Sequence, residues 1–231
     1  MALTILHADE QIVGIDKPSG RLVIPGRVTQ EETVQEEAQR SFGRLWVVHR
    51  LDRGTSGVLV FARTAAAHRS LSIAFERHEV VKQYLALVRG VPSALVRIAC
   101  PLAPARRGRM RPARPGDPGA KSAATRIRLV ERHAARPPLP PLSLVEALPE
   151  TGRTHQIRIH LAWSGTPLLI DPEYGESGPL ADARGEILLA RTPLHAARLE
   201  LRHPSGGQLV RLEAAMPIDM ANTLEAARGH R

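Results

Sequence analysis

The sequence predicts an α+β fold built on a mainly antiparallel sheet. Apolar runs of strand length outnumber segments with helical periodicity, and they occur in pairs separated by short polar stretches. Helical segments fall between these pairs instead of following every strand. Because closely connected strands pair antiparallel, this order favours hairpins over repeated strand–helix–strand units.

The strands are predicted from alternating or continuous apolar runs. These runs cover residues 12–15, 45–48, 58–62, 84–88, 123–130, 142–147, 194–201 and 208–214.

Three segments are predicted to be helices: residues 31–40, 64–77 and 154–164. Thr64 is the expected N-cap of the second helix and Thr154 that of the third, because a threonine hydroxyl accepts from the first free amides of a helix. Gly165 is expected to end the third helix.

A chain of 231 residues with 43% hydrophobic residues can bury a sizeable core. No linker or internal repeat divides it, so we expect one domain over residues 1–231. The proline-rich stretches 100–119 and 136–141 are predicted to be long loops.

Cys100 is the only cysteine, which excludes an internal disulfide and a cysteine-based zinc site. A buried thiol in a reducing compartment is the expected state. The N-terminus lacks the pattern of a signal peptide, and no run of about 18 apolar residues occurs. We therefore expect a cytoplasmic protein.

The formal net charge is +9, and only three of the 32 basic residues are lysine. Arginine binds phosphate bidentately, so this charge favours a nucleic-acid partner. A general compositional bias toward alanine and arginine explains the total equally well.

The distribution of charge favours a nucleic-acid partner. The basic loop 101–121 and the strand after it contain one acid, Asp117, and many basic residues: Arg106, Arg107, Arg109, Arg111, Arg114, Lys121 and Arg126. No aromatic residue in the loop can stack on bases. We expect it to contact the phosphate backbone without selecting a sequence.

A polar segment, residues 49–57, lies between two apolar runs and contains one carboxylate, Asp52. The pattern is that of strand, turn and strand, a common support for reactive groups. Taken alone, this segment favours a simpler role, in which Asp52 caps the turn through nearby backbone amides.

Three further segments change that balance. They are Lys82-Gln83-Tyr84-Leu85-Ala86-Leu87-Val88-Arg89-Gly90, Thr151-Gly152-Arg153-Thr154-His155-Gln156-Ile157-Arg158-Ile159-His160-Leu161 and Asp171-Pro172-Glu173-Tyr174-Gly175. These three segments, the Asp52 segment and Lys17-Pro18-Ser19-Gly20 follow one another along the chain in a characteristic order. By these five segments and their order, the chain resembles the pseudouridine synthases of the RluA type. The resemblance extends from about residue 5 to residue 204.

The resemblance implies the pseudouridine synthase fold: a mixed, mainly antiparallel sheet flanked by helices and loops, with a central active-site cleft. It implies a monomer that acts on a stem-loop of transfer or ribosomal RNA, with no obligate protein partner. Only 16 residues precede Lys17, too few for the S4-type RNA-binding domain of several relatives. We therefore expect a catalytic domain alone.

Isomerising uridine breaks the bond from ribose to N1 and rejoins the uracil through C5, without redox change, so no cofactor is needed. By resemblance Asp52 is the catalytic aspartate, acting on the ribose or on the uracil ring. An ester at the ribose, an adduct at the ring and a glycal route all stay open. Arg158 matches the basic residue that pairs with this carboxylate; a solvated helix arginine is the alternative. The predicted helix places Arg158 on the same face as His155.

Tyr84 matches the tyrosine that stacks on the target uracil, and Ile157 or Leu161 would form the opposite apolar wall. Both are equally well explained as core residues. Arg50 matches the arginine that fills the space of the flipped base, with a structural salt bridge as the alternative. The remaining residues expected to contact RNA are His49, Arg53, Arg153 and His155.

Other chemistries have less support. His155 and His160 are five residues apart, which does not fit the helical zinc-binding pair, so no metal site is expected. An aspartate-dependent hydrolase would need metal ligands or an oxyanion hole that the sequence lacks. A non-catalytic RNA-binding module is the stronger alternative, and Asp52→Asn separates it from an enzyme, since only an enzyme would lose activity.

Overall fold

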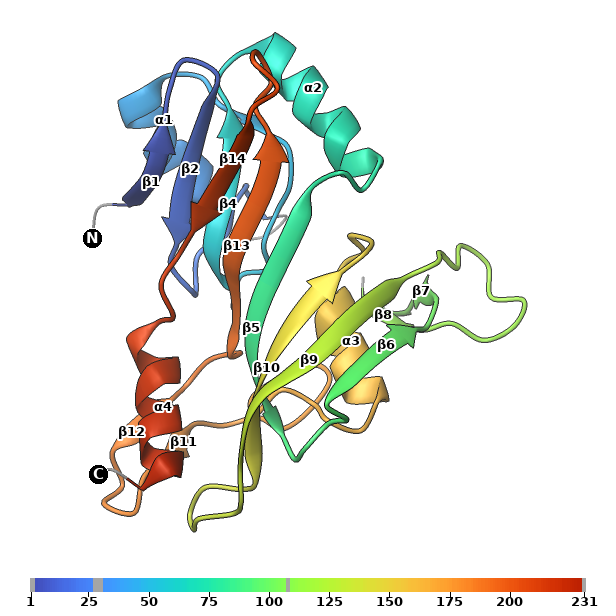
Figure 1. Ribbon diagram of the computed structural model, residues 1–231, viewed down its shortest axis with the longest axis vertical. Helices are drawn as coiled ribbons and strands as arrows, with labels where there is room; N and C mark the ends of the chain where they lie inside the picture. Colours follow the sequence, from blue (N-terminus) through green and yellow to red (C-terminus); the bar gives the residue numbers. More distant parts are fainter. Residues whose placement is uncertain (1–2, 27–30, 107–108, 230–231) are drawn as a thin grey trace. The chain divides into compact units, whose positions relative to one another are not determined.

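The computed structural model describes residues 3–26, 31–106 and 109–229 (Figure 1). They form two compact units, each assembled from two stretches of chain. The first unit comprises Met1–Gln83 and His195–Ala215, and the second Tyr84–Leu194 and Met216–Arg231. Arg107 lies outside the described residues. That residues 1–231 act as one catalytic domain stays a prediction.

The first unit contains a mainly antiparallel sheet. Its strand order is β1 (Thr4–Ala8), β2 (Ile12–Lys17), β4 (Ser56–Ala62) and β13 (Leu194–Arg202). The short β3 (Trp46–Val47) also pairs with β4, and β14 (Leu209–Glu213) with β13. Among the strand pairs described in this unit, β4 and β13 are the pair that runs parallel, through His195 opposite Ser56 and Ala196 opposite Gly57.

Strand β4 is buried along its whole length, which explains why its residues 58–62 are continuously apolar and do not alternate. One face of the sheet packs on α2 (Ala65–Glu76), with Ala67 and Leu71 in the same core cluster as Val58 and Val60. Thr64 caps α2 as predicted, accepting a hydrogen bond from the amide of Ala67 at 3.1 Å.

Helix α1 (Val34–Phe42) begins three residues later than predicted. The reason is a capping box: the Thr33 hydroxyl accepts from the Glu36 amide, and the Glu36 carboxylate accepts from the Thr33 amide at 2.8 Å. This reciprocal pair fixes Thr33 in an extended conformation and defines the first helical residue.

The second unit contains an antiparallel sheet in the order β5 (Val81–Arg89), β10 (Leu142–Pro149), β9 (Ala124–His133) and β6 (Leu95–Ala99). Helix α3 (Gln156–Trp163) packs on this sheet in one apolar cluster (Figure 1). A second cluster joins α4 (Ile218–Arg228) to residues of β5, β10 and β12 (Ile187–Leu189), which pairs with β11 (Leu180–Ala181).

The stretch 100–119, predicted to be a long loop, contains a short hairpin of β7 (Leu102–Pro104) and β8 (Met110–Pro112). Its prolines stand at the ends of the two strands, where fewer backbone donors are needed. The α+β class with a mainly antiparallel sheet is confirmed. Within the described residues, no helix is both long and apolar enough to span a bilayer.

Helix α3 also differs from its prediction. It begins at Gln156, with His155 as N-cap in the left-handed region at φ 55°, and Thr154 does not cap it. Gly165, at φ 84°, follows the helix as expected, and its amide donates to the Ala162 carbonyl at 3.1 Å.

Candidate active site

Asp52 lies in a tight turn directly before β4 in the first unit. The turn is closed by the Thr55 amide, which donates to the Asp52 carbonyl oxygen at 3.1 Å. Thr55 and Ser56 are buried, whereas Asp52 is half-buried. The carboxylate therefore stands at the partly exposed end of a rigid, buried strand.

Gly57 is needed where this turn enters β4. Its φ is +108°, and an added Cβ would lie 2.3 Å from the carbonyl oxygen of Ala196 on β13. Only glycine permits this conformation and this close strand approach. Its presence so near Asp52 fixes the path of the backbone at the end of the turn.

The Lys17-Pro18-Ser19-Gly20 segment holds the Asp52 turn from the other side. The Lys17 side chain is completely buried, and its Nζ donates to the carbonyl oxygens of Pro18 at 2.9 Å, Arg21 at 2.8 Å and Arg53 at 3.3 Å. Burying an ammonium group is costly unless its N–H donors have acceptors, and these three carbonyl oxygens supply them. Lys17 thus connects the residue after Asp52 to the end of β2.

Two neighbouring contacts strengthen the same connection. The Ser19 hydroxyl donates to the Gly54 carbonyl at 2.7 Å, and the Gly20 amide donates to the Arg53 carbonyl at 2.8 Å. The Arg53 Nε in turn donates to the Gly20 carbonyl at 2.8 Å. The turn is thereby fixed by backbone and side-chain bonds at Arg53 and Gly54, the two residues that follow Asp52.

His49 has a structural environment within the first unit. Its Nε2 accepts from the Val60 amide at 3.0 Å, and its ring stacks on Phe75 with centroids 4.7 Å apart. Burial of the ring, with a smaller effect of the nearby Lys82 charge, lowers the pKa of His49 to about 3. The imidazole is therefore neutral near pH 7, with its proton on Nδ1. Contact of His49 with RNA stays a prediction.

The two arginines beside Asp52 differ in their contacts. Arg50 is exposed and has no hydrogen-bond or ion-pair partner among the residues that the structure describes, which disfavours the structural salt bridge. Arg53 pairs with Glu31 through its Nη2 at 2.9 Å, and both side chains are exposed. Such exposed pairs are weak, so Arg53 can exchange this partner for a phosphate.

Arg158 is the charged centre of the second unit. It is 7% exposed, which excludes the solvated helix arginine. Its Nε donates to Oδ2 of Asp171 at 2.8 Å, and its Nη2 to Oδ1 of Asp171 and to Oε2 of Glu173, each at 2.7 Å. Burial opposes ionisation of Asp171, but hydrogen bonds and charge from Arg158 outweigh it and lower the pKa of this carboxyl.

His155 contacts the same segment as Arg158, although it precedes α3 and does not share a helical face with Arg158 as predicted. Its Nδ1 is 2.9 Å from the Tyr174 hydroxyl and 3.2 Å from Oε2 of Glu173. The Arg158 guanidinium lies 5.1 Å from the centroid of the Tyr174 ring. Glu173 and Tyr174 thus join the N-cap of α3 to its first turn.

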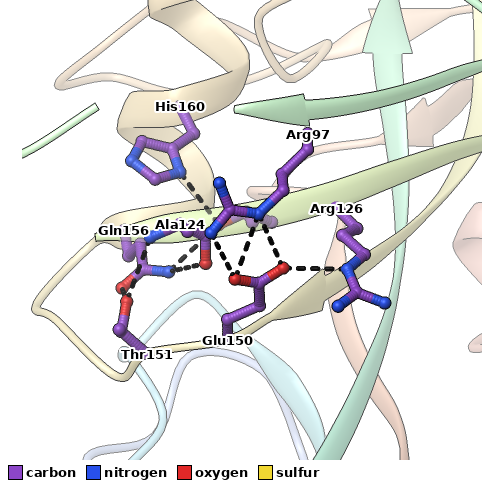
Figure 2. A network of polar contacts seen from close by, with 8 residues as sticks. Arg97, Ala124, Arg126, Glu150, Thr151, Gln156 and His160 are labelled. Carbon is purple, nitrogen blue, oxygen red and sulfur yellow. Dashed lines mark hydrogen bonds and ion pairs between the residues drawn. The ribbon is translucent and has the colours of Figure 1, made fainter. Parts of the chain in front are cut away.

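Gln156 anchors the loop that leads into α3 (Figure 2). Its Oε1 accepts from the Thr151 hydroxyl at 2.6 Å and from the Arg153 amide at 3.0 Å. Its Nε2 donates to the Ala124 carbonyl at 2.9 Å and to the Thr125 hydroxyl at 3.0 Å. These bonds fix the loop without a helix cap from Thr154.

His160 extends this network into the core of the unit (Figure 2). It is completely buried, with Nδ1 2.9 Å from the Thr125 hydroxyl and Nε2 2.9 Å from the Cys100 carbonyl. A carbonyl can only accept, so Nε2 carries the proton and Nδ1 accepts from Thr125. Burial lowers the pKa of His160, which keeps it neutral.

The same close-up shows an ion cluster at the surface of the sheet, where Glu150 accepts from both Arg97 and Arg126. The hydrogen bond from Arg97 is the main cause that lowers the pKa of Glu150 to about 2. Cys100 is buried as predicted, and burial raises the pKa of its thiol. Among residues 3–26, 31–106 and 109–229, no three metal-ligating side chains are grouped to hold an ion.

Tyr84 is brought together with the predicted apolar wall. It lies half-buried on β5, opposite Ala147 of β10, and packs against the cluster that includes Ile157 and Leu161. Leu161 is completely buried and Ile157 is 6% exposed, so both serve as core residues of α3. Stacking of the Tyr84 ring on a uracil stays a prediction.

The basic hairpin presents some of its predicted arginines and pairs others. Arg106 is exposed, and Arg109 is exposed with its Nε 3.8 Å from Oε1 of Glu173. Arg111 instead pairs with Asp117, with Nη2 2.8 Å from Oδ1. This hydrogen bond is the main cause that lowers the pKa of Asp117 to about 2.

Arg153 is held by its neighbours, with its Nε donating to the Ser122 carbonyl at 3.1 Å. Asp52, His49, Arg50 and Arg53 belong to the first unit, whereas Tyr84, Arg158 and the hairpin belong to the second. The pairing of Asp52 with Arg158 therefore stays a prediction.

Sequence reasoning missed the roles of Lys17, Asp171, Glu173 and Tyr174, although their motifs were recognised. Lys17 and Asp171 are the buried charges of their segments. One signal was available: Asp171 directly follows the apolar run 168–170, and Lys17 follows the run 12–15 after one residue, Asp16. That position is compatible with burial only if a partner is present.

Comparison with known proteins identifies the family. Residues 11–163 match the RNA pseudouridylate synthase family. The chain is 38% identical to ribosomal large subunit pseudouridine synthase D of Nitrosomonas europaea, over 98% of this chain and 65% of that protein. It is 37% identical to ribosomal large subunit pseudouridine synthase C of Escherichia coli O6:H1, over the whole chain and 72% of that protein.

Solved structures agree. The human RNA pseudouridylate synthase domain containing 4 protein superposes with a TM-score of 0.75 at 26% identity, covering 97% of this chain and 93% of that one. The domain containing 1 protein gives 0.73 at 27% identity, covering 92% and 83%. The resemblance found in the motifs is confirmed, and the chain belongs to the family of RNA pseudouridylate synthases.

Proposed function

We propose that this protein isomerises uridine to pseudouridine in ribosomal RNA, with Asp52 as the residue that acts at the target nucleotide. The observation that carries the proposal is the family match over residues 11–163, which spans the Asp52 turn, Tyr84 and Arg158. The relatives from Nitrosomonas and Escherichia are named for the large ribosomal subunit, and they supply the class of RNA.

The geometry of the Asp52 turn supports this role. The carboxylate is carried at the end of a buried strand, and Lys17, Ser19 and Gly20 fix the residues that follow it. A catalytic group that is already held in its productive orientation loses no further conformational entropy at each turnover. The route through the ribose, the ring or a glycal stays open.

The second unit supplies the other proposed components. Tyr84 offers a half-buried aromatic face to the extracted uracil, and Arg158 a buried, oriented guanidinium to the Asp52 carboxylate or the nucleotide. Arg50, Arg106 and Arg109 are exposed and can reach phosphates. The protein would act as a monomer in the cytoplasm on a stem-loop, which RNA readers recognise by shape and splayed bases.

The test measures release of tritium from cellular RNA labelled at uracil C5. Wild type should release tritium, and Asp52→Asn should bind the same RNA with unchanged affinity and release none. Arg44→Gln is a matched control, because Arg44 is an exposed residue of the first unit whose side chain lies over Trp46, at 4.7 Å from the ring centroid. Release by Asp52→Asn would refute the assignment, and no release by wild type would favour an RNA-binding module.

A further inference from the structure

We propose that Asp171 is a positioning residue that sets the orientation of the Arg158 guanidinium, with Glu173 as a second, weaker support. The inference rests on the proposed function, in which Arg158 acts beside the reacting nucleotide. It assigns a role to the Asp171-Pro172-Glu173-Tyr174-Gly175 segment, whose chemistry the reaction itself does not use.

The contacts of Asp171 are those of a fixed acceptor. Its side chain is 1% exposed. Its Oδ2 accepts from Nε of Arg158, and its Oδ1 from Nη2 of Arg158, from the Glu173 amide at 3.0 Å and from the Tyr174 amide at 3.2 Å. Because backbone amides hold the carboxylate, it cannot follow the arginine, and the arginine must adopt the plane of the carboxylate.

The backbone around Asp171 is closed as well. The Asp171 amide donates to the Glu176 carbonyl at 2.7 Å, and the Gly175 amide donates to the Asp171 carbonyl at 2.9 Å. Ile170, directly before it, is buried in the core cluster shared by β5 and α4. The acceptor is therefore attached to the sheet on one side and tied into a tight turn on the other.

Glu173 and Tyr174 extend the same support toward the hairpin. Glu173 accepts from Arg158 and lies 3.2 Å from the His155 Nδ1, but its side chain is 30% exposed. The Tyr174 hydroxyl accepts from the Met110 amide of β8 at 3.4 Å. Glu173 is thus more easily replaced than Asp171, and its loss should have the smaller effect.

A buried arginine and carboxylate could equally serve stability alone, and the chain offers a control for that reading. Arg191 and Asp219, in the same unit, form a second bidentate pair, with Nε to Oδ2 at 2.6 Å and Nη2 to Oδ1 at 2.8 Å. None of the predicted site residues takes part in it. Asp219→Asn reproduces the chemical change of Asp171→Asn at a pair with no expected part in the reaction.

The experiment compares the full-length Asp171→Asn, Asp171→Glu, Glu173→Gln and Asp219→Asn variants. Kinetics use tritium release from cellular RNA labelled at uracil C5, and unfolding midpoints are recorded for each. Asp171→Asn should lower kcat about 100-fold, the loss that a misplacement of about 1 Å produces, with KM changed by less than about threefold. Glu173→Gln should lower kcat measurably, by about three- to tenfold, and Asp219→Asn should leave it unchanged.

Asp171→Glu separates position from charge. It keeps the negative charge and displaces the carboxylate by one methylene, so a positioning role predicts a loss of kcat close to that of Asp171→Asn. Full activity of Asp171→Glu, or equal kcat in Asp171→Asn and Asp219→Asn, would overturn the proposal. If Asp171→Asn does not fold, Glu173→Gln decides, because an unchanged kcat there overturns the proposal.

A second readout does not depend on activity. A buried, doubly bonded guanidinium gives a slowly exchanging Nε–H signal in nitrogen-15 NMR spectra, which Arg158→Lys would assign. That signal should persist in Asp219→Asn and disappear in Asp171→Asn. Its persistence in Asp171→Asn refutes positioning, whereas activity of Asp52→Asn refutes the proposed function, so the two failures are distinguishable.

Discussion

Replacing Lys17 by methionine tests how the Asp52 turn is supported. The substitution keeps the length of the side chain and removes the donor to three carbonyl oxygens, those of Pro18, Arg21 and Arg53. The Arg53 carbonyl keeps the Gly20 amide as donor and Pro18 is exposed to water, so the acceptor most affected is the carbonyl of the half-buried Arg21. At about 1–3 kcal/mol for one unsatisfied acceptor, the gross cost is about 1–3 kcal/mol.

A compensating gain reduces this figure, because the buried ammonium group no longer has to be desolvated. We expect a net loss of about 1–2 kcal/mol in the free energy of unfolding, measured by urea titration. Tritium release should show a lower kcat with little change in KM, because the turn that carries Asp52 loosens while the basic hairpin is untouched.

Lys121→Met is the control, because Lys121 is exposed and should change stability by less than about 0.5 kcal/mol. The reasoning is refuted if Lys17→Met unfolds at the same urea concentration as wild type. It is also refuted if stability falls as predicted but kcat is retained, since Lys17 would then support the fold and not the turn.

Three other predictions follow from separate features. Gly57→Ala should destabilise the protein by at least about 3 kcal/mol, since its Cβ would meet the Ala196 carbonyl at φ +108°; a normal melting temperature would contradict this. His49 is neutral in the folded state with a pKa of about 3 against 6.5 unfolded, so the unfolded state binds the extra proton and stability falls as pH drops from 6.5 toward 3. Urea midpoints at pH 7.5 and 5.0 should differ less in His49→Gln than in wild type, and an equal difference would exclude His49 as the cause. Arg106→Ala should reduce the slope of the logarithm of the RNA binding constant against the logarithm of salt concentration by about 1. Arg111→Ala removes an arginine already paired with Asp117 and should leave this slope nearly unchanged. Equal slopes for the two variants would show that the pairing with Asp117 does not affect RNA binding.

The sheet and its main strands could be predicted because their buried residues form continuous or alternating apolar runs in the sequence. Residues 58–62 of β4 are continuously apolar because the strand is buried, and Thr64 marks the start of α2 because its cap lies next to the helix in sequence. Helix α4 was not predicted, since its buried face consists of Met220, Thr223, Leu224 and Ala227, two of which are weakly apolar. β1 and β6 were missed because their strands are largely half-buried or exposed.

The start of α3 could not be derived from local rules. Thr154 is a favourable cap by residue type, but the side chain of Gln156 bonds to Thr151 and to β9, and these distant contacts decide where the helix begins. The partners of Arg158 were inaccessible for the same reason. Asp171 is 13 residues away, and no periodicity relates the two positions. Motif resemblance located the residues, and tertiary contacts determine what each one touches.

Because the first unit is assembled from two separate stretches of chain, it cannot complete its folding until late in synthesis on the ribosome. Ser56 of β4 meets His195 of β13, 139 residues later in the chain. At about 5–20 residues per second, Ser56 and Gly57 of β4 stay without their β13 partner for on the order of 10 s after they are synthesised. During that interval the nascent chain is a target for chaperones and for premature association with its neighbours.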